Sequence, residues 1–156
     1  MPEIIDCFRG ENFVYSNFYG IPVVYKDHVY KSSEHAFHAQ KATNEKDRQY
    51  IEDAPTPGIA KRRGREIKCR ADWNDIRVDE MASIVYAKFS RNSHLHDKLC
   101  STGDSLIIEG NAHGDTFWGM VKDSKGEWVG KNNLGKILMI VRGVFLTSQK
   151  MTDHIL

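Results

Sequence analysis

The chain has 156 residues, of which 40% are hydrophobic and 28% charged, which suits one globular domain with a substantial core and leaves no room for a second of ordinary size. Lys and Arg total 22 against 21 for Asp and Glu, so the net charge of +1 does not call for a polyanionic partner, and a nucleic-acid role would have to rest on local charge.

The cysteines and the apolar segments of the sequence indicate the cellular compartment. The three cysteines, Cys7, Cys69 and Cys100, are far apart and form no C-x-x-C pair, which argues against a disulfide framework and against a cysteine zinc site. The sequence shows neither a signal-peptide pattern nor an apolar run long enough to span a membrane. We therefore expect a cytoplasmic protein without a membrane partner.

The first elements are a hairpin and a helix. Two apolar runs, 23–25 and 29–30, flank a short polar segment and predict a β-hairpin. Asn17 precedes it in an irregular turn, where an asparagine commonly satisfies its own backbone. Ser32 and Ser33 can cap a helix that starts at about Glu34.

Glu34 has two interpretations. A carboxylate in the first turn of a helix is favoured by the helix dipole, which is the ordinary structural explanation. However, Glu34 shares its helix face with Phe37, His38 and Lys41, which favours an inward position in a site.

Two further helices and a basic run follow. Asn44 can cap a helix to about Asp53, and a third helix begins at Thr56–Pro57 and is predicted to end at Gly64. Six of the ten residues in 61–70 are basic, so this run either binds phosphates or nucleic acid or forms a solvated face.

The next helix runs from about Asp75 or Val78 to Arg91, after Trp73. Val78, Met81 and Val85 mark its apolar stripe, and Lys88 falls on the same stripe. A lysine there must either extend its amine to solvent or neutralise an anion in a site.

The last third of the chain contains the segment richest in reactive groups. A short helix over 93–100 and a strand over 105–108 lead into residues 109–119, which hold two carboxylates, three glycines, a histidine and a tryptophan. Asn132 or Asn133 then caps a strongly apolar helix predicted over 134–146 at the centre of the fold. Residues 149–156 carry little pattern.

The sequence motifs of several common types of catalytic and binding site are absent. The two close histidine pairs do not have the H-E-x-x-H form, so we expect no metal site. No phosphate-binding loop, dinucleotide-binding glycine motif or serine-hydrolase elbow occurs. The remaining possibility is a site in which carboxylates do the chemistry beside aromatic side chains.

The ordered motifs of residues 8 to 146 resemble the NADAR family, also called YbiA-like. The segments that carry the resemblance are 16–18, 33–37 with 40–42, 64–65, Trp73, 88–89, Leu99 with 102–103, 108–109 with Asp115 and 118–119, and 130–142. The segment 111–114 departs from the family, many members of which have a small residue and proline there, so this loop is expected to influence substrate choice.

The resemblance implies a single compact, helix-rich α+β domain with a small β-hairpin or sheet, over residues 1–148, followed by a C-terminal tail at 149–156. It also implies a metal-independent N-glycosidase without a cofactor. The implied substrates are ADP-ribose on guanine in DNA, a related ADP-ribosyl conjugate, or ribosylated pyrimidine phosphates of riboflavin synthesis. The alternative is a non-catalytic module that binds ADP-ribose or NAD-derived nucleotides.

The site residues follow from the same resemblance. Cleavage of a ribosyl C–N bond passes through an oxocarbenium-like state, which needs a carboxylate near C1′ and help for the departing base. The family positions give Glu34, Glu109 and Asp115 as catalytic candidates, with their individual roles open. The substrate-binding candidates, expected to line one ribosyl pocket with the carboxylates, are Asn17, Phe18, Arg65, Trp73, Lys88, Trp118, Gly119 and Asn132.

Overall fold

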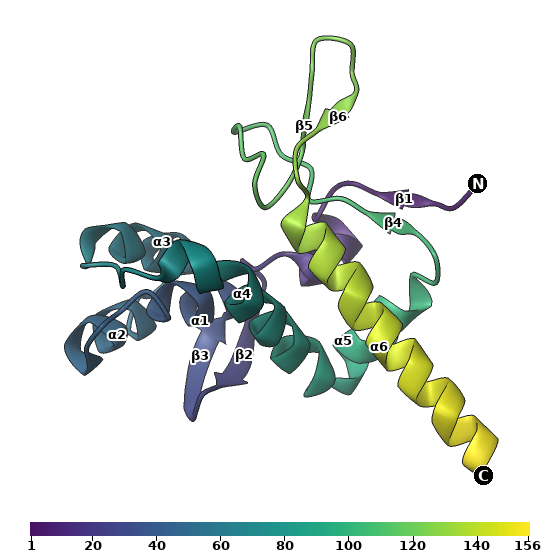
Figure 1. Ribbon diagram of the computed structural model, residues 1–156, viewed down its shortest axis with the longest axis horizontal. Coiled ribbons are helices and arrows are strands. Elements are labelled where there is room, and N and C mark those ends of the chain that lie inside the picture. Colours follow the sequence, from purple (N-terminus) through teal and green to yellow (C-terminus); the bar gives the residue numbers. More distant parts are fainter. The chain divides into compact units, whose positions relative to one another are not determined.

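The computed structural model describes residues 1–156 and combines helices with three short two-stranded sheets (Figure 1). This confirms the expected helix-rich α+β class. The chain divides into two compact units, which we call the middle unit, residues 16–91, and the terminal unit, residues 1–15 with 92–156.

The middle unit begins with the predicted hairpin. Strand β2 (Gly20–Tyr25) pairs antiparallel with β3 (His28–Ser32) (Figure 1). Tyr25 lies opposite His28 in this pairing. The two connecting residues, Lys26 and Asp27, have φ of 48° and 66°. Positive φ at both positions is the geometry of a two-residue turn that matches the twist of the strands. The hairpin therefore closes tightly without a glycine.

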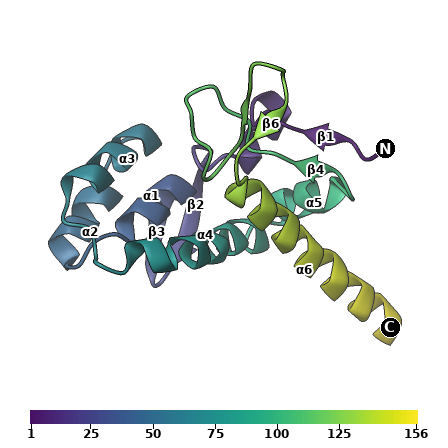
Figure 2. The same cartoon turned by 45° about the horizontal axis from the view of Figure 1, so that its top comes forward.

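Four helices complete the middle unit, and side-chain caps define where three of them start. Ser32, Asn44 and Thr56 each accept a hydrogen bond from a first-turn amide, as the sequence predicts for caps. The helices are α1 (Ser33–Ala39), α2 (Glu45–Glu52), α3 (Pro57–Glu66) and α4 (Trp73–Ser90). Helices α1, α2 and α3 lie side by side (Figure 2).

Two helix predictions in this unit were wrong in detail. Helix α3 does not end at Gly64, because this glycine is buried within the helix, where a Cβ would lie 2.7 Å from Nδ1 of His38. Helix α4 starts already at Trp73, and Val78 is exposed. Its buried residues are Trp73, Met81, Ile84, Val85, Lys88 and Phe89.

The terminal unit holds the remaining elements. Strand β1 (Ile4–Ile5) pairs in parallel with β4 (Leu106–Ile107), and β5 (Val121–Lys122) pairs antiparallel with β6 (Trp128–Val129). The 3₁₀ helix η1 covers Gly10–Tyr15, and α5 covers Ser93–Ser101. Helix α6 (Asn133–Ile155) packs against α5 and β4.

Helix α6 differs from its prediction in length and burial. It continues to Ile155, through the residues expected to form a tail, as one unbroken helix (Figures 1 and 2). Only one face is buried, since Ile140 and Val144 are exposed on the other. None of the helices combines the length and apolar composition that a membrane span needs.

Candidate functional site

The eleven predicted site residues are distributed over both units. The middle unit contains Asn17, Phe18, Glu34, Arg65, Trp73 and Lys88, and the terminal unit contains Glu109, Asp115, Trp118, Gly119 and Asn132. The prediction that all of them line one pocket stays a prediction.

Glu34 is a buried carboxylate held by a histidine one helical turn later. Its side chain lies in the first turn of α1, and the residue is only 7% exposed. Its Oε1 lies 2.8 Å from Nε2 of His38, which is also buried. Glu34 therefore points inward, as the helix face that it shares with Phe37 predicts, and its place in the first turn of α1 also agrees with the dipole explanation.

His38 is a functional candidate that our sequence reasoning missed. Burial lowers the pKa of this imidazole, while the hydrogen bond and charge of Glu34 act in the opposite direction. The i, i+4 spacing of the two residues was visible in the sequence. The sequence pattern placed His38 on the same helix face as Glu34 but indicated no role for it, and its pairing with His35 lacks the H-E-x-x-H form.

Trp73 and Lys41 lie beside this pair. The Trp73 ring packs on Phe37 with centroids 4.9 Å apart, and Nζ of Lys41 lies 5.8 Å from the centroid of Trp73. Burial lowers the pKa of Lys41, the charge of Glu34 counteracts this, and Arg65 and Lys61 lower it further. The surroundings of Glu34 are therefore electropositive, which suits an anionic ligand.

The basic run is only partly available to such a ligand. Arg63 donates to the carbonyl of Tyr50 at 2.7 Å and lies over its ring. Arg62 pairs with Glu66 and Arg70 with Asp72. Arg65 is exposed and has no carboxylate partner. The solvated-face interpretation thus holds for part of the run.

Lys88 is a buried cation. The residue is 3% exposed, and its Nζ donates to the carbonyl of Ser16 at 2.9 Å. Burial lowers the pKa of Lys88 to about 7. The amine does not extend to solvent. This favours the other interpretation from the sequence, in which Lys88 neutralises an anion bound in a site.

The turn at Ser16–Asn17 connects Lys88 with Glu34. The carbonyl of Ser16 accepts from Lys88, and the carbonyl of Asn17 accepts from the amide of Glu34 at 3.1 Å. The side chain of Asn17 is buried and donates to Sδ of Met81 at 3.4 Å, so its interpretation as a self-satisfied turn residue was wrong. Phe18, by contrast, is 40% exposed.

In the terminal unit, two hydrogen bonds of the Asn132 side chain fix the backbone at Glu109, and we call this arrangement the Asn132 clamp. Asn132 has a left-handed backbone (φ 52°), and its Oδ1 accepts from the amide of Glu109 at 3.0 Å while its Nδ2 donates to the carbonyl of Ile107 at 2.9 Å. Its side chain does not cap α6, contrary to expectation. A Cβ on Gly135 would lie 2.3 Å from the carbonyl of Ile107, so the helix approaches the strand closely.

Loss of this clamp should destabilise the protein measurably. We expect Asn132→Ala to reduce the free energy of unfolding by about 2 to 4 kcal/mol, because one buried and one partly buried backbone group lose their partners and alanine is strained at positive φ. Urea denaturation measures the loss. Asn133→Ala is the control, since the contact of Asn133 with Phe117 is made by its backbone. Equal losses in both variants would contradict the clamp.

The loop around Asp115 is folded by its own polar groups. Oδ1 of Asp115 accepts from the amides of Phe117 at 3.0 Å and Trp118 at 2.9 Å, and the side chain of Asn111 bonds to the amide and carbonyl of Asp115. A Cβ on Gly119 would lie 2.1 Å from the carbonyl of Glu109. Asp115 thus has a structural role, and its catalytic role stays a prediction.

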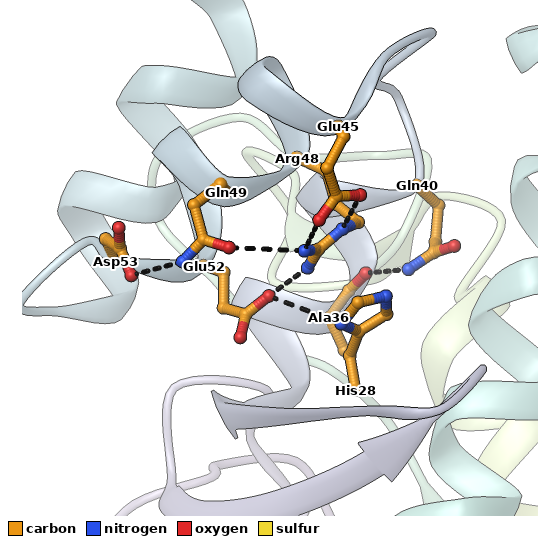
Figure 3. A network of polar contacts seen from close by, with 8 residues as sticks. All are labelled: His28, Ala36, Gln40, Glu45, Arg48, Gln49, Glu52 and Asp53. Carbon is orange, nitrogen blue, oxygen red and sulfur yellow. Dashed lines mark hydrogen bonds and ion pairs between the residues drawn. The ribbon is translucent and has the colours of Figure 1, made fainter.

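The charge of Arg48 is already balanced by two carboxylates of α2. Figure 3 shows the guanidinium between Glu45 and Glu52, with His28 3.7 Å from the carboxylate of Glu52. A cleft of about 310 Å³ lies beside it and contains none of the predicted site residues. No group of three or more His, Cys, Asp or Glu side chains is placed to hold a metal ion.

Comparison with known proteins agrees with the resemblance. A model of the NADAR domain matches residues 7–145. N-glycosidase YbiA of Escherichia coli is 32% identical over 130 residues, covering 82% of this chain and 78% of that protein. An N-glycosidase of Nostoc punctiforme is 34% identical and covers 82% of each chain. A riboflavin biosynthesis protein of Vibrio vulnificus is 38% identical over 129 residues, but the chain spans only 34% of its length.

Comparison with solved structures identifies the same family of proteins. The NMR structure of Escherichia coli YbiA superposes with a TM-score of 0.82 and 30% identity, covering 97% of this chain and 89% of that one. These matches confirm the resemblance, the α+β fold and the general class of N-glycosidase.

Proposed function

Because this chain belongs to the NADAR family and is in its general class an N-glycosidase, we propose that it hydrolyses the C–N bond between a phosphorylated ribose and a base. The observation that carries the proposal is the buried Glu34 carboxylate, held by His38 in electropositive surroundings. An ionised carboxylate stabilises the positive charge that develops at C1′ as the base departs.

The other site residues take roles that match their chemistry. Lys88 and Arg65 would bind phosphate, and Trp73 or Trp118 would stack on the base, a contact worth on the order of 1 to 3 kcal/mol in nucleic-acid binders. Asn17, Phe18, Gly119 and Asn132 would shape the binding surface. Glu109 and Asp115 would supply the remaining acid and base functions, activating water and protonating the departing base.

The substrate we favour is a ribosylated pyrimidine phosphate. Two relatives support it by name, since the proteins of Vibrio vulnificus and Zea mays are both called riboflavin biosynthesis proteins. ADP-ribose on guanine in DNA is the second candidate, and the cations that support it are Lys61 and Arg65 on α3, which have no carboxylate partner in the structure.

The test incubates the protein with each substrate and follows release of the free base by chromatography. We expect release from the pyrimidine phosphate. Release only from ADP-ribosylated DNA would overturn our choice of substrate. Tight binding with both ligands recovered unchanged would overturn the hydrolase and favour the binding module.

Asp115 offers a sharper test of the catalytic set. Asp115→Asn keeps an oxygen for the amides of Phe117 and Trp118 but loses the charge, so we expect unchanged thermal stability and a fall in kcat on the order of 10²-fold. Asp115→Ala should lose stability as well. Full turnover in Asp115→Asn would show that this carboxylate only folds the loop.

A further inference from the structure

The two ring nitrogens of His38 have different surroundings. Nε2 lies 2.8 Å from Oε1 of Glu34. Nδ1 is buried and has no hydrogen-bond partner. The backbone of Gly64 in α3 packs against it so closely that a Cβ there would lie 2.7 Å away. A histidine that relays a proton needs access to both nitrogens, and here one of them is closed off.

The surroundings also determine the charge and tautomer of the ring. Burial lowers the pKa of His38, and the nearby cations Lys41, after α1, and Lys61, on α3, disfavour a second positive charge. The neutral ring therefore carries its proton on Nε2, the only nitrogen with an acceptor, and donates it to Glu34.

We propose that His38 is a positioning residue, a fixed donor whose Nε2–H bond holds the Glu34 carboxylate in one orientation. The inference rests on the proposed N-glycosidase function and deepens it, because it assigns Glu34 the charged role at C1′ and leaves proton delivery to the base to another group.

Gly64 is part of this arrangement. Only a residue without a side chain lets α3 approach His38 so closely, because any Cβ at position 64 would lie 2.7 to 3.0 Å from Nδ1, Cγ and Cβ of His38. The close packing fixes the ring plane and therefore the direction of the Nε2–H bond. His38 and Gly64 thus act together on the orientation of Glu34.

Two substitutions of His38 separate positioning from packing. His38→Gln retains an N–H donor near the position of Nε2 and does not titrate, whereas His38→Leu fills similar space without a donor. We expect kcat to fall on the order of 10²-fold in His38→Leu with little change in KM, as for a misplaced catalytic group. His38→Gln should recover most of the lost turnover.

The retained donor gives a second readout. In His38→Gln kcat should stay near the wild-type value, so the loss in His38→Leu would come from the missing N–H and not from the changed shape of the side chain. The matched control is His35→Gln. His35 is also buried in α1 but bonds to Ser32 and to the carbonyl of Ala54, so its replacement should lower stability without the fall in kcat expected for His38→Leu.

A measurement independent of turnover keeps the two proposals apart. In ¹⁵N NMR of the imidazole at neutral pH we expect a single neutral tautomer with the proton on Nε2. A doubly protonated ring, a proton on Nδ1, or wild-type kcat in His38→Leu would overturn the role of His38. Absence of base release by the wild type, together with the expected tautomer, would instead overturn the proposed function.

Discussion

Replacement of Glu34 by glutamine should reduce kcat on the order of 10² to 10⁴-fold while the protein stays folded. Glutamine preserves the shape of the side chain and an oxygen that accepts from Nε2 of His38, but it removes the negative charge proposed to stabilise C1′. Because the charge matters mainly in the transition state, KM should change little. Steady-state kinetics on the released base measures both constants.

The control for this substitution is Glu66→Gln. Glu66 belongs to the same unit but is exposed and bonds to the hydroxyl of Tyr50 and to Arg62. Its loss should leave kcat unchanged. Retained turnover in Glu34→Gln, with thermal unfolding equal to the wild type, would show that the chemistry lies elsewhere.

Replacement of Lys88 by methionine should stabilise the protein and weaken substrate binding. The folded-state pKa of Lys88 is about 7, well below the ordinary value of 10.5, because charging the buried amine is unfavourable. Between these two pH values the unfolded chain binds more protons than the folded one, so wild-type stability rises with pH in this window. Below pH 7 the full penalty applies, on the order of 3 to 5 kcal/mol.

Methionine has no charge and similar length, so this penalty disappears. We expect the free energy of unfolding of Lys88→Met to exceed that of the wild type at pH 6 to 7, with a difference that shrinks as the pH rises toward 10.5. KM should rise, because a phosphate would lose its buried cation. Urea denaturation at several pH values and steady-state kinetics measure the two effects.

Lys136→Met serves as the control, since Lys136 is exposed on α6 and its replacement should change stability by no more than about 0.5 kcal/mol at any pH. A constant stability difference between Lys88→Met and the wild type from pH 6 to 10 would contradict the lowered pKa of the buried Lys88.

The sequence by itself determined those features that depend on neighbouring residues. Helix caps such as Ser32, Asn44 and Thr56 bond to amides three residues later, and a tight hairpin depends on the two residues between its strands. The ordered motifs likewise sufficed to recognise the NADAR family. The helix-rich α+β class and the N-glycosidase class followed from these local and ordered signals.

The tertiary structure alone decided the roles that depend on residues distant along the chain. The burial of Lys88 depends on packing around α4, and the clamp of Asn132 joins residues 23 and 25 positions apart. Gly64 carries the usual signal of a helix end, yet it lies inside α3, at a position where His38, 26 positions earlier, leaves no space for a side chain. Propensity is a weak preference, and close packing against another element overrides it.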